Sequence, residues 1–228
     1  MKLVLTCEHG GNLIPENYQH YFKTHLDVLT THRGYDLGAL NLFKGLRPLA
    51  YFSKFSTTSR LLIELNRSLH HPSLFSEFSK TLSKAEKKTL IENYYLVYRG
   101  DVKSTINKLI NSNEKVVHIA VHSFTPILNA VERHCDIGLL FDSKIKEEKA
   151  FCKQLKNQIK KEIPDFNVRY NYPYLGTADG FTSYLRKQFP KNFIGIELEI
   201  NQKFSLKNHM DSEVKQMLYK TLEHITYS

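Results

Sequence analysis

Cysteine is scarce in this 228-residue chain, and its three cysteines are odd in number and far apart: Cys7, Cys135 and Cys152. Such a set does not build a disulfide framework, and it lacks the close pairing of a cysteine-type zinc site. Unpaired cysteines are typical of a reducing compartment, so we expect a cytoplasmic protein.

Long hydrophobic runs are also missing. No apolar stretch approaches the roughly 18 residues that a membrane-spanning helix needs. The N-terminus, MKLVLTCEHGG, has a short apolar run that ends in charged and glycine residues. That run is too short for a secretion signal and favours a first buried strand. We therefore expect no membrane partner and no export.

Acidic residues are fewer than basic ones, at 23 against 32, which gives a net charge of +9 and a pI of about 9.3. A basic surface attracts anions. The lysines are scattered along stretches that resemble helix surfaces, however, and the chain has no arginine-rich arm, RNA-binding aromatic motif or zinc-finger spacing. Solvated helix faces explain them, and we expect no nucleic-acid partner.

What remains is the composition of a globular protein, 41% hydrophobic with a mean hydropathy of −0.39. The length suits one domain over residues 1–228. Short apolar runs with the character of buried strands are Lys2–Thr6, Leu49–Lys54, Leu61–Leu65, Val116–His122, Ile137–Phe141 and Phe193–Ile200. Helical patterns between them are Arg33–Gly45, Ser83–Asn111, Ile145–Glu162, Gly180–Phe189 and Ser212–Ile225. This alternation predicts an α/β fold with a mostly parallel sheet covered on both faces.

Polar residues gather where strands end. Glu8 and His9 follow the first predicted strand, and His122 with Ser123 closes the Val116–His122 strand. Ligand sites in open α/β sheets form just beyond the carboxyl ends of the strands. We therefore expect these residues to meet in one site.

Two histidines at such positions suggest a metal centre. A catalytic zinc typically uses three protein ligands and a water, and imidazole is a favoured ligand. His9 and His122 would supply two ligands, and the third candidates are Asp36, Glu8 and Asn12. His32 and Asp36, four residues apart, would share one face of a helix. Each histidine alone could equally be a hydrogen-bonded residue at a strand end.

Two further groups of polar residues suit catalysis and substrate binding. Glu197 and Glu199 alternate along one strand face, where buried carboxylates are costly unless they are paired, metal-bound or functional. One of them is a candidate general base, and a salt-bridged pair is the alternative. Arg60, and Asn66 next to Arg67, could clamp a carboxylate, because a guanidinium is a rigid donor fork. A surface ion pair is the alternative for Arg67.

A tyrosine- and glycine-rich stretch, Asn171–Gly180, suits a loop that covers a substrate, with Tyr174 within it. The alternative is a plain long connection.

Taken together, these segments resemble the N-formylglutamate amidohydrolase family. The resemblance covers nearly the whole chain and rests on motifs in the family's order: CEHGGNLIP (7–15), THRGYDLGA (31–39), SRLLIELNRS (59–68), AVHSFTP (120–126), DIGLLFD (136–142), NYPYLGTADG (171–180) and IELEIN (196–201). It implies a fold related to the zinc carboxypeptidases. That fold is a three-layer, phosphorylase/hydrolase-like α/β sandwich with a mostly parallel mixed sheet.

The resemblance also implies roles for single residues. His9 and His122 would bind the metal, and Glu197 would be the general base. The family's usual acidic ligand position is Asn12 here, so Asp36 is the predicted third ligand, with Glu8 next. Glu199 stands where relatives often carry arginine, and the loss of a cation there weakens binding of a dicarboxylate.

The predicted function is hydrolysis of the amide bond of an N-acyl, or N-formyl, amino acid with a free carboxylate, such as N-formylglutamate. A divalent metal, with Zn²⁺ preferred, would act with Glu197. The predicted substrate-binding residues are Arg60, Asn66, Arg67, Ser123 and Tyr174. The alternatives are a metal-dependent peptidase or amidase acting on a peptide or cell-wall fragment, and a non-catalytic relative that binds anions.

Overall fold

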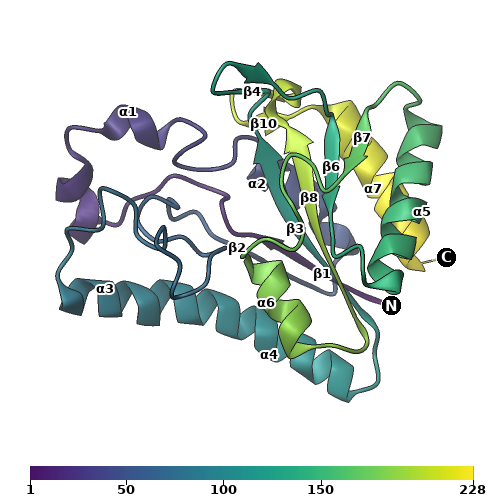
Figure 1. The fold of residues 1–228 in the computed structure, drawn as a ribbon, viewed down its shortest axis with the longest axis horizontal. Helices are drawn as coiled ribbons and strands as arrows, with labels where there is room; N and C mark the ends of the chain where they lie inside the picture. Colours follow the sequence, from purple (N-terminus) through teal and green to yellow (C-terminus); the bar gives the residue numbers. More distant parts are fainter. Residues whose placement is uncertain (228) are drawn as a thin grey trace.

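A six-stranded sheet runs through the middle of the protein, with helices on both of its faces (Figure 1). The structure is a computed structural model that describes residues 1–227. The strand order is β2-β1-β3-β8-β6-β7, and neighbours are parallel except that β6 runs antiparallel to β8. The six strands are β1 (Lys2–Cys7), β2 (Phe52–Phe55), β3 (Val116–Phe124), β6 (Ile137–Leu140), β7 (Val168–Tyr170) and β8 (Phe193–Asn201).

Helices account for most of the remaining regular structure. The α-helices are α1 (Leu26–Leu29), α2 (Ala39–Leu46), α3 (Lys84–Leu90), α4 (Val97–Asn111), α5 (Lys146–Glu162), α6 (Phe181–Gln188) and α7 (Ser212–Tyr227). A π-helical stretch, η3 (Ile91–Leu96), joins α3 to α4, and short 3₁₀ segments are η1 (Glu16–Phe22), η2 (Arg47–Leu49) and η4 (Gln202–Phe204). Two small hairpins are formed by β4 (Ile127–Leu128) with β5 (Val131–Glu132) and by β9 (Ser205–Leu206) with β10 (His209–Met210).

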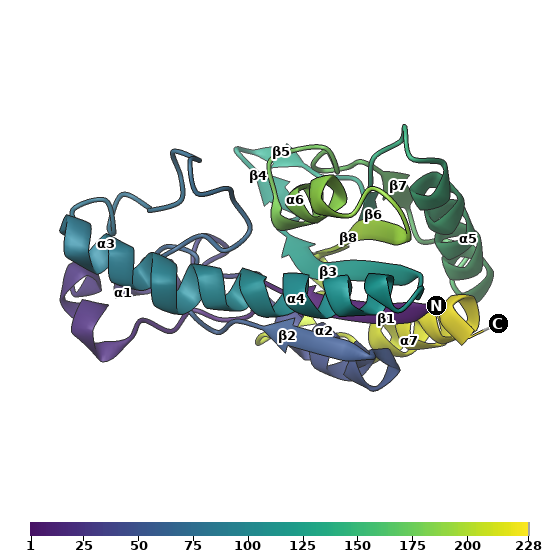
Figure 2. The ribbon, with the colours of Figure 1, turned by 90° about the horizontal axis from the view of Figure 1, so that it is seen from below.

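Each face of the sheet has its own apolar core, because side chains alternate along a strand. Val117, Ile119 and Val121 of β3 pack in a cluster with α2, α5 and α7. Val116 belongs to the cluster on the opposite face, with α4 and α6. Figure 2 shows the layers from below. The predicted fold class, a three-layer α/β sandwich with a mostly parallel mixed sheet, is confirmed. None of the helices within residues 1–227 is long and apolar enough to cross a membrane.

The prediction of a strand over Leu61–Leu65 is wrong. All five residues are buried, but they form turns in a loop. Their backbone groups bond to another loop instead of a ladder: Glu64 N donates to Leu74 O at 2.9 Å, and the Ser79 hydroxyl donates to Leu61 O at 3.0 Å. A short apolar run indicates that a segment is buried, but a buried loop accounts for such a run as well as a strand does.

The helix predicted over Arg33–Gly45 begins later, at Ala39. The residue before it, Gly38, has φ of +78°, which a glycine adopts without strain. His32 therefore lies in a turn and Asp36 in an irregular segment before the helix, so the two do not share a helix face. The strand predicted over Leu49–Lys54 is also displaced: η2 comes first, and the strand is Phe52–Phe55.

Candidate metal centre and active site

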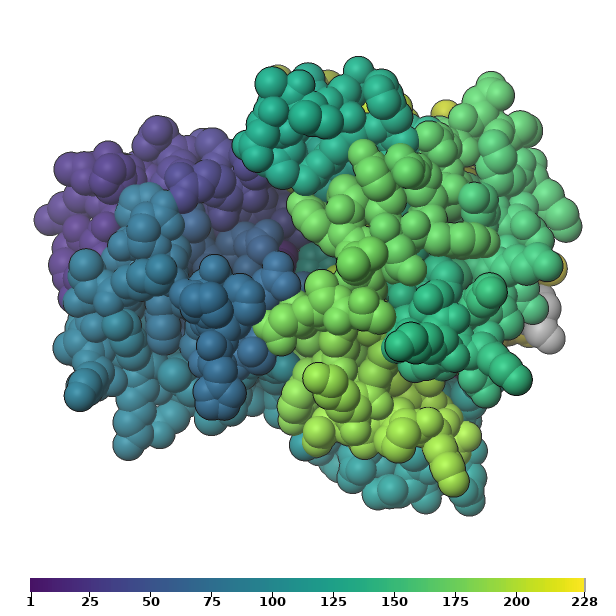
Figure 3. Space-filling model, in the orientation of Figure 1, coloured from purple at the N-terminus to yellow at the C-terminus, as the bar shows by residue number. Residues whose placement is uncertain are grey.

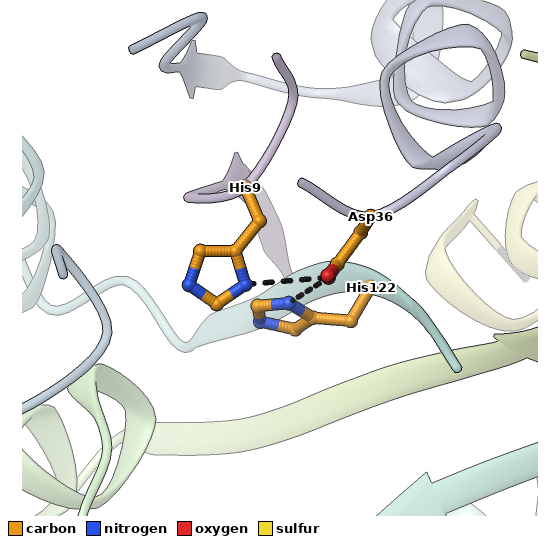
Figure 4. Close-up of side chains that lie close together, drawn as sticks. All are labelled: His9, Asp36 and His122. Atoms are coloured by element: carbon orange, nitrogen blue, oxygen red, sulfur yellow. Dashed lines mark hydrogen bonds and ion pairs between the residues drawn. The ribbon is translucent and has the colours of Figure 1, made fainter. Parts of the chain in front are cut away.

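Three buried side chains from distant segments meet at the carboxyl end of the sheet. His9 follows β1, Asp36 precedes α2, and His122 lies near the end of β3. Their potential ligand atoms all lie within 4.8 Å of one another. Figure 4 shows both imidazoles directing a nitrogen at the Asp36 carboxylate, with Nδ1 to Oδ2 distances of 3.3 Å for His9 and 2.9 Å for His122. Two imidazole nitrogens and a carboxylate oxygen form a donor set that suits zinc.

The outer nitrogen of each histidine faces a second buried carboxylate. His9 Nε2 is 2.5 Å from Glu64 Oε1. His122 Nε2 is 3.3 Å from Glu8 Oε2, close enough for an ion pair but without hydrogen-bond geometry. The hydroxyl of Tyr98 donates to the other Glu8 oxygen at 3.1 Å. A carboxylate behind a histidine fixes its orientation and leaves the inner nitrogen free to bind a metal. The residues present therefore fit a divalent ion.

Opposite charges dominate the electrostatics of this group. Burial alone would raise the carboxyl pKa values, but contacts with the histidines outweigh it. They lower the pKa of Glu8 to about 2 and hold that of Asp36 well below its ordinary value. Burial likewise would lower the pKa of His122, but its contacts with the acidic Asp36 and Glu8 raise it. The carboxylates therefore stay ionised, which is the state a metal ligand requires.

Arg60 pairs with two carboxylates of this group. Its guanidinium donates to Glu64 Oε2 through Nε at 2.8 Å, and Nη1 lies 3.4 Å from Asp36 Oδ1. The predicted substrate-binding arginine thus lines the cavity while it pairs with Asp36, between the histidines, and with Glu64, behind His9.

Glu197 and Glu199 project from β8 on the same face as His122. In the sheet, Glu199 pairs with His122 and Glu197 with Ala120. Both are buried, with exposed fractions of 9% and 5%. Among the residues that the structure describes, none forms a hydrogen bond or ion pair with either carboxylate, so the alternative of a salt-bridged pair does not hold.

Burial also raises the pKa of both carboxyls on β8. That of Glu199 reaches about 7, with the charges of Asp36 and Glu197 adding to the effect of burial. Carboxyls with pKa values moved toward neutrality suit proton transfer.

A cavity of about 170 Å³ opens beside these groups. Figure 3 shows this face hollowed where the purple and blue N-terminal segments meet the green segment near residues 170–180. The residues that line it are His9, Asp36, Arg60, Asn66, Arg67, His122, Ser123, Tyr174, Leu175, Ala178, Asp179, Glu197 and Glu199. The structure thus brings every predicted site residue together, while His32 is exposed and Asn12 is not among the lining residues.

Asn66, Arg67 and Ser123 also bind neighbouring protein groups. Asn66 Oδ1 accepts from the backbone N–H of Phe181 at 2.7 Å, at the start of α6. Arg67 donates to the backbone carbonyl of Asp179. The hydroxyl of Ser123 donates to the Leu37 carbonyl at 2.7 Å. The Asn66–Arg67 pair therefore holds the covering loop as well as facing the cavity.

The covering loop, Asn171–Gly180, packs closely against Gly138. A Cβ atom at Gly138 would lie 2.0 Å from the Tyr172 carbonyl oxygen, so a larger residue would displace the loop. At the cavity edge, Arg133 donates to the hydroxyl of Tyr174 at 3.3 Å, and its guanidinium carbon lies 5.3 Å from that ring's centre.

Sequence reasoning missed the roles of Glu64 and Arg133. The available signal for Glu64 was an acid inside the apolar run LLIELN, where an unpartnered charge would be costly. Arg133 follows a two-residue strand, and no sequence pattern marks it as a residue of the site.

Comparison with known proteins supports the predicted amidohydrolase family. A family model described as N-formylglutamate amidohydrolase matches residues 1–206. A solved structure of a gene product from Agrobacterium tumefaciens is similar, with a TM-score of 0.76 and 24% identity, over 98% of this chain and 91% of that chain. The N-formylglutamate amidohydrolase from Ralstonia eutropha has a TM-score of 0.71 and 16% identity, over 100% of this chain and 93% of that chain. At these identities the structures show a shared fold. No curated protein matches the sequence.

Proposed function

The chain belongs to the N-formylglutamate amidohydrolase family, which makes it a hydrolase of linear amide C–N bonds, and we propose that it hydrolyses an N-acyl amino acid with the help of a divalent metal ion. The substrate carries a formyl or similar small acyl group and a free α-carboxylate; N-formylglutamate is the compound that the family's name suggests. The observation that carries this proposal is the buried group of His9, Asp36 and His122 beside two unpartnered carboxylates in one cavity.

The ion would be held by Nδ1 of His9, Nδ1 of His122 and a carboxylate oxygen of Asp36. Zn²⁺ is the ion that this donor set favours. When bound, such an ion supplies Lewis acidity to an amide carbonyl and to water. Glu64 and Glu8 hold the two imidazoles from behind, as the 2.5 Å and 3.3 Å contacts indicate.

Glu197 is the proposed general base. It takes the proton from the attacking water, and the same proton then goes to the nitrogen of the leaving amine. Its position on the cavity wall and its raised pKa, caused by burial, suit both transfers.

The substrate carboxylate would bind at Arg67 and Asn66. A guanidinium has five N–H donors, and the bond from Arg67 to the Asp179 carbonyl leaves others for a ligand. Arg60, Ser123 and Tyr174 complete the lining. Holding the carboxylate aligns the amide with the reacting groups. We place the enzyme in the cytoplasm, because Cys7, Cys135 and Cys152 are all unpaired.

The test combines metal analysis with a substrate panel. The purified protein should contain close to one zinc per chain, or be activated by added zinc, and should hydrolyse N-formyl amino acids faster than N-acetyl or peptidyl analogues. E197Q should keep the metal and lose about 10²–10⁴-fold in kcat, because only the proton transfers are removed. The matched control is E223Q, which makes the same change on the exposed surface of α7 and should keep full activity.

Several outcomes would contradict the proposal. Full activity in E197Q would refute the assignment of the base. Neither bound metal nor zinc activation, with no hydrolysis, would indicate a non-catalytic binding protein. A strong preference for peptidyl substrates would favour the peptidase alternative.

A further inference from the structure

Glu199 lies on the cavity wall with a carboxylate that no described residue engages. The residue is 5% exposed, and its Oε2 is buried without a hydrogen-bond partner. It projects from the same strand face as Glu197. Because the proposed mechanism gives both proton transfers to Glu197, Glu199 has no part in the chemistry.

The arginines around this cavity already have partners. Arg60 bonds to Glu64 and Asp36, Arg67 to the backbone carbonyl of Asp179, and Arg133 packs against Tyr174. An ionised carboxylate is costly to bury alone. A ligand that brings its own donors to Glu199 therefore gains a strong interaction.

The cavity wall at Glu199 is acidic. Glu197 adds a second carboxylate to the same wall. Ammonium and guanidinium groups carry several donors and no acceptor, so they match such a surface. An acidic side chain would instead bring a further negative charge next to two carboxylates.

We propose that Glu199 recognises the substrate's side chain, and that the substrate is an N-acyl amino acid whose side chain ends in an ammonium or guanidinium group. The inference rests on the proposed function, since it assumes that the cavity binds an N-acyl amino acid. It assigns the α-carboxylate to Arg67 and Asn66, and the cationic end to Glu199.

The test compares side chains of similar length and different charge. Values of kcat/KM are measured for Nα-formyl derivatives of lysine, arginine, norleucine and glutamate, with wild type, E199Q and the control E223Q. Charge-assisted hydrogen bonds distinguish such ligands by about tenfold or more. We expect wild type to prefer lysine or arginine over norleucine by that factor, E199Q to bring the ratio close to one, and E223Q to keep it.

A second readout does not depend on turnover. The free amino acids lysine, arginine, norleucine and glutamate are titrated into the zinc-loaded protein and into E199Q by calorimetry. Tighter binding of the cationic amino acids that disappears in E199Q supports the inference, even if no formyl compound is hydrolysed, in which case the proposed function fails alone. Hydrolysis with a preference for glutamate or norleucine overturns the inference and leaves the proposed function standing. If E199Q does not fold, the comparison of cationic and uncharged ligands on the wild-type protein still tests the preference for a cationic side chain.

Discussion

Replacing Glu8 by glutamine tests whether the acid behind His122 controls the nitrogen that faces the metal centre. Glu8 Oε2 lies 3.3 Å from His122 Nε2, and the Tyr98 hydroxyl donates to Oε1 at 3.1 Å. An ionised carboxylate only accepts hydrogen bonds. Its negative charge, 3.3 Å from His122 Nε2, also favours the histidine tautomer with hydrogen on Nε2 and a lone pair on Nδ1, which is the nitrogen 2.9 Å from Asp36.

The size of the effect follows from this geometry. In E8Q the amide oxygen can keep the bond from Tyr98, and the amide NH₂ then faces His122 Nε2. A donor at that place favours the other tautomer, whose Nδ1 carries hydrogen and cannot bind a metal. Losing such a support typically weakens metal affinity about 10–100-fold, or about 1.4–2.8 kcal/mol.

The assay is competition for Zn²⁺ against a chromophoric chelator, with thermal unfolding of the metal-free proteins as a check of folding. Y98F is the matched control: it removes one hydroxyl from the same network and leaves the charge of Glu8, so we expect a smaller loss of affinity. A zinc Kd in E8Q within about threefold of wild type, in a folded protein, would refute the reasoning.

Two further predictions concern the covering loop and the core. G138A should displace the loop, since the new Cβ would lie 2.0 Å from the Tyr172 carbonyl; we expect faster limited proteolysis within residues 171–180 and a higher KM, and unchanged proteolysis would contradict this. His118, buried beside Thr6, has a pKa that burial lowers from 6.5 to about 4. The pKa of His118 is lower in the folded than in the unfolded protein. The free energy of unfolding is therefore highest above pH 6.5 and falls by up to about 3 kcal/mol as the pH drops to 4. Urea unfolding across that range should show the loss, and H118Q should reduce it; an equal slope in both proteins would exclude His118 as its source.

The central strands could be predicted from the sequence because they are buried on both sides. Val116–His122 and Phe193–Ile200 are short, largely apolar runs, and the structure extends them only to Phe124 and Asn201. Helix ends could also be predicted where the local sequence signal was strong. Ser83 begins α3 with a capping box, in which its side chain and that of Glu86 each accept from the other's backbone N–H.

Parts of the site could not be predicted, because they depend on contacts between distant segments. Glu64 lies in a buried loop, and only the fold shows that this loop passes behind His9. Arg133 reaches Tyr174 across 41 residues of chain. The polar residues at strand ends were visible as candidates, but the sequence alone left Asp36, Glu8 and Asn12 open as the third ligand. The structure places Asp36 between the histidines and Glu8 behind one of them.

The separation of the three central residues along the chain has a consequence for folding. Asp36 is 27 residues from His9 and 86 from His122. The strand that His9 follows, β1, pairs directly with β3, which carries His122. Closing such long loops is slow, and it is complete only when the central sheet has formed. Short fragments of this chain would therefore hold no preassembled centre. An ion that binds the finished centre and not the unfolded chain would raise the melting temperature in proportion to the logarithm of its concentration, so heat stability would report how fully the enzyme is loaded.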